Sequence, residues 1–252
     1  MLSSAPYQTI DDAIAGLATL ESGFRAQHDR RCVFLTVYGM MTRQMKQRTA
    51  SGFFMDNDWA GRYTVAFANQ YLVALCSFEG QPSQTPAAWR IAFDTSVRGQ
   101  ALILQDLFLG INGHISNDLA FALTKVGIDP DRSTRYQDHT AINQILSDVT
   151  DAVEARLNEL YTPGFAGIQN CPVRIDREAA NFSLPIAREG AWESAVALAN
   201  ARNDAERSTI TFMIEQRAAV LAKLILAPNL DPLLIARLHE IELGTTWWEA
   251  LK

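Results

Sequence analysis

His114 and Asp118 are the residues whose types and spacing most directly indicate chemistry in this sequence. They are four positions apart, so on a helix they share one face. An imidazole titrates near neutral pH, and a carboxylate bonded to one ring nitrogen fixes which nitrogen carries the proton. The pair therefore predicts either a metal site or a histidine general base that an aspartate orients.

The segment around this pair, 102–123, predicts one long helix that is apolar on almost every side. Such a helix is normally buried, and polar groups inside it need hydrogen bonds, charge partners or a metal. Gly110 and Gly113 lie on the same side as His114, which indicates that a neighbouring helix or a ligand approaches closely there. Helix packing is the commoner reason. A buried His–Asp pair also fits a purely structural polar cluster that sets the packing of the core.

A second group of candidates falls on a helix expected over 136–160. Asn143 lies in an apolar stripe, where an amide needs hydrogen-bond partners. Asp138 is interpreted either as a metal ligand or as a residue that caps a helix N-terminus. The expected catalytic residues are His114, Asp118 and Asn143. The expected metal ligands are His114, Asp118 and Asp138, with Zn, Fe or Mn as the candidate metals.

Helical periodicity dominates the rest of the chain, and strand-like alternation is hard to find. Helices are expected from Ile10 after a Thr9 cap, over 31–47, from a cap at Asp56 or Asn57 to Leu75, from Pro86 after a Thr85 cap, and over 102–123, 136–160, 177–201, 205–226 and from 232 onward. A short strand or turn is expected over 169–176. We therefore predict an all-α single domain spanning residues 1–252, a multi-helix bundle around one buried central helix.

Composition excludes several classes of function. The net charge of −6 argues against a nucleic-acid partner. The three cysteines form no CxxC pair, so neither a zinc knuckle nor a disulfide framework is indicated. We see no signal peptide and no uncharged apolar run long enough to span a membrane, so the cytoplasm is the default location. Trp247 and Trp248 are interpreted as a packing or homodimer contact.

The motif from Leu107 to Leu119, LFLGINGHISNDL, resembles the hallmark of an uncharacterised bacterial family, LGxNAHIxxDL. Gly113 stands where that family has alanine. The resemblance extends over most of the chain, to Trp59, 67–72, Ala88-Trp89, 136–138, Asn143, Arg188 and Ala191-Trp192. It implies no activity. Because the resemblance includes residues of both candidate helices, Asp138 and Asn143 are expected to approach the same cavity as His114.

A more distant similarity is to helical zinc-dependent phospholipases C and single-strand nucleases, which also place histidine and aspartate four apart on a core helix. Their trinuclear site needs more histidines than the four of this sequence. The distant similarity therefore leaves a site with one or two metal ions as the expectation.

The sequence leaves three hypotheses for the function. Metal-assisted hydrolysis at a buried His/Asp site is the leading hypothesis. A metal-free acid–base enzyme or a protein that binds a small molecule is the alternative. The third is a protein without catalytic activity, whose polar cluster is structural.

Overall fold

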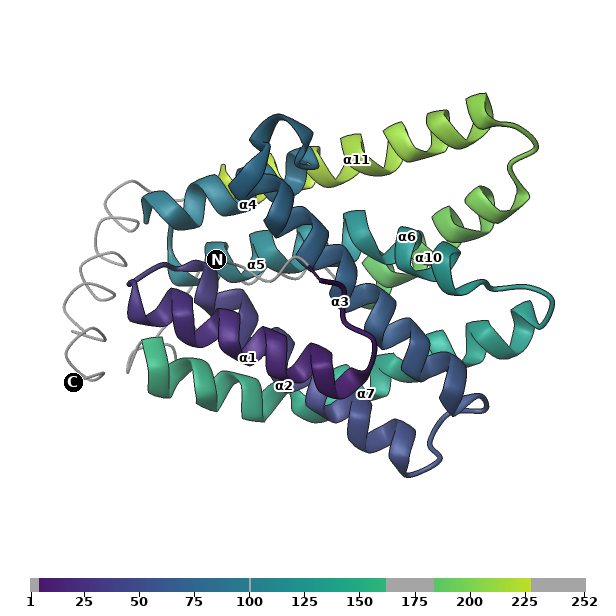
Figure 1. The fold of residues 1–252 in the computed structure, drawn as a ribbon, viewed down its shortest axis with the longest axis horizontal. Coiled ribbons are helices and arrows are strands. Elements are labelled where there is room, and N and C mark those ends of the chain that lie inside the picture. The colour runs from purple at the N-terminus through teal and green to yellow at the C-terminus, as the bar shows by residue number, and fades with distance from the viewer. Residues whose placement is uncertain (1–4, 100, 162–183, 228–252) are drawn as a thin grey trace.

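Helices build the part of the chain that the computed structural model describes, residues 5–99, 101–161 and 184–227, and no strand occurs among those residues. The main helices are α1 Ile10–Ala26, α2 Arg31–Ala50, α3 Asn57–Gly80, α4 Ala87–Arg98, α5 Ile103–Asn112, α6 Leu119–Val126, α7 Arg132–Tyr161, α10 Leu184–Asn200 and α11 Asp204–Leu226. A 3₁₀ turn, η1, covers Pro82–Gln84, and a π-helical segment, η2, covers Gly113–Asp118. The predicted all-α class is confirmed (Figure 1).

Some predicted features lie outside the described residues. They are the strand or turn at 169–176, the beginning of the helix at 177–201, the last helix, and the Trp247-Trp248 pair.

Two predicted caps are present. The Thr9 hydroxyl accepts a hydrogen bond from the Asp12 backbone N–H at 3.1 Å, and the Asp12 carboxylate accepts one from the Thr9 N–H. Asp56, rather than Asn57, caps α3 by accepting from the Trp59 N–H at 2.8 Å. The prediction that Thr85 caps the next helix is wrong, because α4 begins at Ala87 with Pro86 in the cap position.

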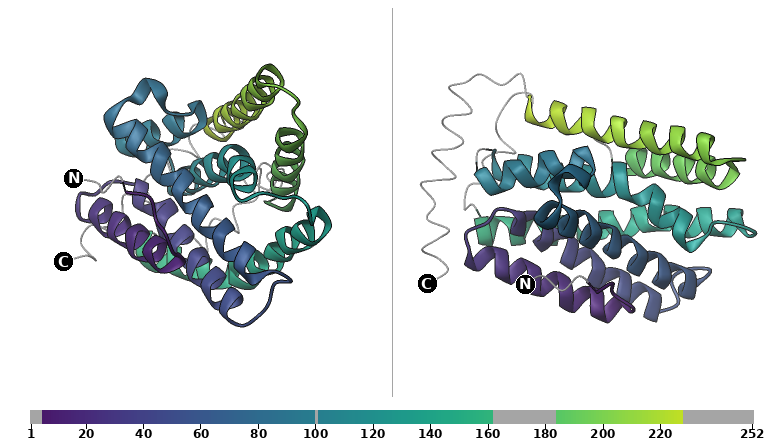
Figure 2. Two further views of the ribbon diagram at one scale, coloured as in Figure 1. Left: turned by 45° about the vertical axis from the view of Figure 1, so that its right-hand side comes forward. Right: turned by 45° about the horizontal axis from the view of Figure 1, so that its top comes forward.

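The predicted central helix is continuous through α5, η2 and α6, since the residues at both junctions keep helical backbone angles. It runs through the middle of the bundle and packs against α2, α3, α4, α10 and α11. Figure 2 shows α10 and α11 on one side of it and α1 to α3 on the other. The sequence did not predict the π-helical turn in its centre.

The two glycines of this helix are explained by helix packing. A Cβ on Gly110 would lie 2.5 Å from the ring of Phe34, which comes from α2. A Cβ on Gly113 would lie 2.8 Å from the Trp89 indole of α4. The absence of side chains therefore brings two aromatic residues against the central helix near His114.

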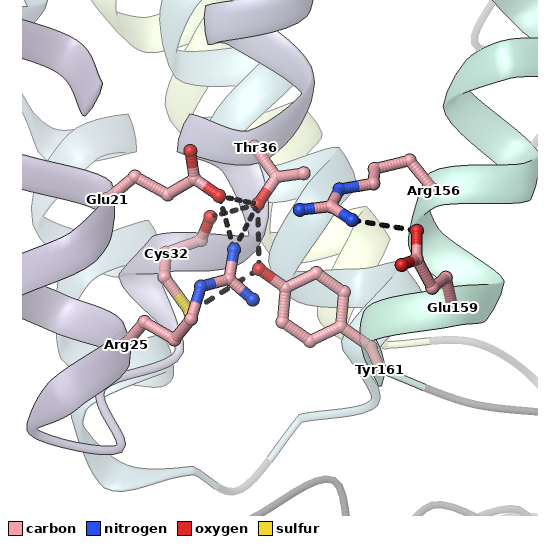
Figure 3. Close-up of polar contacts among 7 residues, drawn as sticks. All are labelled: Glu21, Arg25, Cys32, Thr36, Arg156, Glu159 and Tyr161. Carbon is pink, nitrogen blue, oxygen red and sulfur yellow. Dashed lines mark hydrogen bonds and ion pairs between the residues drawn. The ribbon is translucent and has the colours of Figure 1, made fainter. Parts of the chain in front are cut away.

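A polar cluster joins the end of α7 to α1 and α2 (Figure 3). The hydroxyl groups of Thr36 and Tyr161 are 2.7 Å apart, and Thr36 also donates to Glu21. Arg25 donates to both Glu21 and Thr36. Burial raises the pKa of the neighbouring Cys32 thiol to about 11, so it is a neutral packing group and not a nucleophile. The cluster fixes one end of α7 in place.

Among the helices of the described residues, none combines the length and the apolar character needed to cross a membrane.

Candidate functional site

The predicted contact between His114 and Asp118 is present in the π-helical turn. Nδ1 of His114 lies 3.2 Å from Oδ2 of Asp118, and the two residues are 3% and 2% exposed. Trp89 donates its indole N–H to the same oxygen at 2.9 Å, and Asn117 donates to the other at 2.9 Å. The two partners whose direction is fixed, Trp89 and Asn117, are both donors to this carboxylate. Single-turn π segments inside α-helices are frequent at functional sites.

These contacts decide the protonation of His114. An ionised carboxylate accepts hydrogen bonds only, so Nδ1 carries the proton and Nε2 keeps a free lone pair. Burial lowers the pKa of His114 below its usual value, although Asp118 opposes this shift, so the ring is neutral at pH 7. Nε2 is buried and has no hydrogen-bond partner among the residues described. It is an unused acceptor.

Aromatic side chains hold the imidazole in position. Phe67 of α3 stacks on it, with ring centroids 3.4 Å apart and planes 8° from parallel. Tyr38 of α2 meets it edge-on at 4.3 Å. The ring is therefore fixed from two further helices as well as through Asp118.

His114 forms part of the wall of a cavity of about 420 Å³. The walls come from α2, α3, α5, η2 and α7, with Leu184 and Arg188 of α10. Most of the lining side chains are apolar, and the volume is typical of a site for a small molecule. A few polar groups facing an apolar cavity are the usual pattern of ligand recognition.

Asp138, one of the expected metal ligands, is hydrogen-bonded to the backbone that precedes α3. Its two oxygens accept the backbone N–H groups of Met55 and Asp56 at 2.7 and 2.9 Å. It therefore ties α7 to the beginning of α3. Within the described ranges, no cluster of three or more His, Cys, Asp or Glu side chains is arranged to hold a metal ion. The expected set of His114, Asp118 and Asp138 is thus not brought together.

Asn143, one of the expected catalytic residues, is hydrogen-bonded to Arg188. It is half-buried, and its Oδ1 accepts from Nε of Arg188 at 2.8 Å. Neither Asn143 nor Asp138 belongs to the cavity wall, whereas Arg188 does. The link between the two helices and the cavity exists, but it passes through the arginine that Asn143 positions.

Arg188 and His139 are polar groups near this site that are not among the expected catalytic residues or metal ligands. Nη2 of Arg188 donates to the backbone carbonyl of His139 at 2.6 Å. The His139 ring lies 3.2 Å from the Tyr63 hydroxyl and 3.2 Å from the Arg188 carbonyl. Burial, with a contribution from Arg188, lowers the pKa of His139 to about 2. The signal in the sequence is an arginine that shares a helical face with Leu184, Ala191 and Trp192.

A family model described as "Family of unknown function (DUF5995)" matches residues 10–228. The chain belongs to this family. The match includes His114, Asp118, Arg188 and all of the helices that line the cavity. No curated protein and no solved structure gives a significant match, so the more distant similarity to zinc-dependent phospholipases and nucleases is unconfirmed.

Proposed function

We propose that the protein binds a small, largely apolar molecule in the cavity beside His114, and that Nε2 of His114 accepts a hydrogen bond from it. The observation that carries this proposal is the buried Nε2 lone pair, which has no partner in the described part of the chain and belongs to a residue of an apolar cavity wall. Leaving a buried polar atom unsatisfied costs about 1–3 kcal/mol. An O–H or N–H group of a ligand would remove that cost.

A metal-free acid–base reaction at the same nitrogen is the second candidate. It is favoured by the contact between Nδ1 and Asp118, because a carboxylate in that position orients a histidine base and stabilises its protonated form. Metal-assisted hydrolysis has less support. It needs a further ligand beside His114 and Asp118, and the oxygens of Asp138 are already bonded to the backbone at the start of α3.

The binding proposal is tested with N-phenyl-1-naphthylamine, a neutral fluorophore that brightens in apolar surroundings and has one N–H donor. We expect saturable binding at one site per chain and displacement by 1-decanol. Val149 is buried in the cavity wall, so Val149→Trp should fill the space and weaken binding at least tenfold.

The matched control is Val97→Trp, at an α4 position that is 53% exposed and not part of the cavity wall. It should bind the fluorophore as the wild type does. Circular dichroism establishes that both variants keep their helices. Equal affinity of Val149→Trp and wild type, or no saturable binding by the wild type, would refute the proposal.

A further inference from the structure

Arg188 is a buried cation without a carboxylate partner among the residues of the described ranges. It is 3% exposed, and its described hydrogen bonds go to neutral groups, Asn143 Oδ1 and the carbonyl and ring of His139. Burying a charge without an opposite charge is unfavourable, so such a group is usually paired. Arg188 also belongs to the cavity wall, so a negatively charged ligand in the cavity would supply the missing partner.

The guanidinium keeps donors for such a partner. It has five N–H groups in a fixed planar arrangement and stays protonated at neutral pH. The bonds to Asn143 and His139 use Nε and Nη2. These bonds leave Nη1 for a further acceptor, and the Tyr63 hydroxyl also interacts with the guanidinium.

The cavity is elongated along α7. Its wall includes α7 residues from Ile142 to Leu157, which is a rise of about 22 Å along the helix. Arg188 is bonded to His139 and Asn143, at the beginning of this stretch. Arg188 thus lies at one end of a long, mainly apolar space.

Two other polar groups of the wall lie further along. Tyr63 of α3 contacts His139, which is at the Arg188 end of the cavity. Phe67 is one turn further along α3 and stacks on His114. His114 therefore lies about one helical turn beyond the Arg188 end. Glu154 belongs to the wall about 16 Å along α7 from Asn143. The positive charge of Arg188 and the negative charge of Glu154 are therefore well separated.

We propose that the ligand is an elongated aliphatic carboxylic acid, with its carboxylate at Arg188 and its chain extending along α7 past His114, where an O–H or N–H group carried by the chain donates to Nε2. This inference rests on the proposed function, because it names the class of molecule that enters the same cavity. A guanidinium N–H donates a charge-assisted hydrogen bond to a carboxylate oxygen, and the apolar wall accommodates a hydrocarbon chain.

The test compares decanoate, 1-decanol and decylamine as competitors of N-phenyl-1-naphthylamine at pH 7.5. They share one chain length, and their ends are negative, neutral and positive. We expect decanoate to bind about tenfold more tightly than 1-decanol, and decylamine to bind most weakly. Equal or tighter binding of 1-decanol, or a preference for decylamine, would overturn this inference while leaving ligand binding intact. Absence of binding by every probe would overturn the proposed function as well.

A variant series assigns the preference to one side chain. Arg188→Met should bring decanoate to the affinity of 1-decanol, and Arg188→Lys should keep part of the preference. Arg202→Met removes the same charge at a side chain that is 83% exposed, and it should bind all three competitors as the wild type does. If Arg188→Met folds and retains the full preference, the proposal is wrong. If it does not fold, the comparison of the three competitors on the wild type still decides.

Discussion

At the scale of single residues, burial decides the charge of both histidines at the site. His114 and His139 are 3% and 1% exposed, and burial is the largest cause that lowers the pKa of each. His114 is opposed by the neighbouring Asp118, whereas for His139 the nearby Arg188 adds to the effect. Both rings are therefore neutral acceptors or donors at pH 7 rather than cations.

This predicts a pH-dependent stability. The unfolded chain takes up a proton on His139 as the pH falls through about 6.5, whereas the folded protein does so only near pH 2. The unfolded state therefore binds more protons between these values, and the free energy of unfolding falls as the pH falls. We expect His139 to contribute a loss of about 2 kcal/mol between pH 7 and pH 5. Urea unfolding at pH 7, 6 and 5 measures it.

His139→Asn removes the titrating group and should flatten the pH dependence by about that amount. His114 contributes a change of the same sign, because its pKa is also lowered, so a smaller slope remains in the variant. An unchanged slope in His139→Asn would show that this histidine takes up its proton over the same pH range in the folded and the unfolded protein.

The contact between His114 and Asp118 was predictable from the sequence, because residues four positions apart on a helix share one face. The roles of Asp138 and Asn143 were not. Their partners are the backbone at Met55 and Asp56 and the side chain of Arg188, which lie 83, 82 and 45 residues away in sequence. A polar residue in a helical stripe shows that a partner is needed, but it does not show which one.

At the scale of elements, the central helix depends on close approach by its neighbours. Gly110 admits Phe34, which also lines the cavity and lies 5.6 Å from the His114 ring. Gly113 admits Trp89, whose indole N–H holds Asp118. The glycines thus connect helix packing to the geometry of the site.

Gly110→Ala should lower the free energy of unfolding by about 1–2 kcal/mol, because overpacking outweighs the gain in helix propensity. It should also weaken binding of N-phenyl-1-naphthylamine, since the displaced Phe34 ring belongs to the cavity wall. The matched control is Gly23→Ala, on the exposed face of α1 with no atom near the new methyl group. It should raise stability by up to about 1 kcal/mol. Equal effects of the two substitutions in denaturant titrations would contradict this packing.

Helix positions and two caps followed from periodicity and cap residues, since these are local signals. The π-helical turn did not, because its six residues have no composition that separates them from an α-helix. Its wider turn is visible only in the folded backbone.

At the scale of the whole molecule, the site is a product of several helices. The cavity wall takes side chains from α2, α3, α5, η2, α7 and α10. The wall includes residues of the central helix and of α7, whose C-terminal end is held by the Tyr161 cluster. The apolar stripes of these helices were predictable as buried faces. The cavity between these faces was not predictable, because a residue on a cavity wall and a residue in a packed core have the same sequence pattern.

The central claim is that neutral His114 offers Nε2 to a ligand in this cavity. Long-range ¹H–¹⁵N correlation spectra of the histidine rings test it most directly, with the His114 signals assigned from a His114→Phe variant. We predict an unprotonated Nε2 and a protonated Nδ1 at pH 7. Addition of 2-naphthol should shift the Nε2 resonance in the direction of a hydrogen-bonded nitrogen, whereas 2-methoxynaphthalene, which has no donor, should not. A proton on Nε2, or a resonance that 2-naphthol leaves unchanged at saturation, would contradict the account.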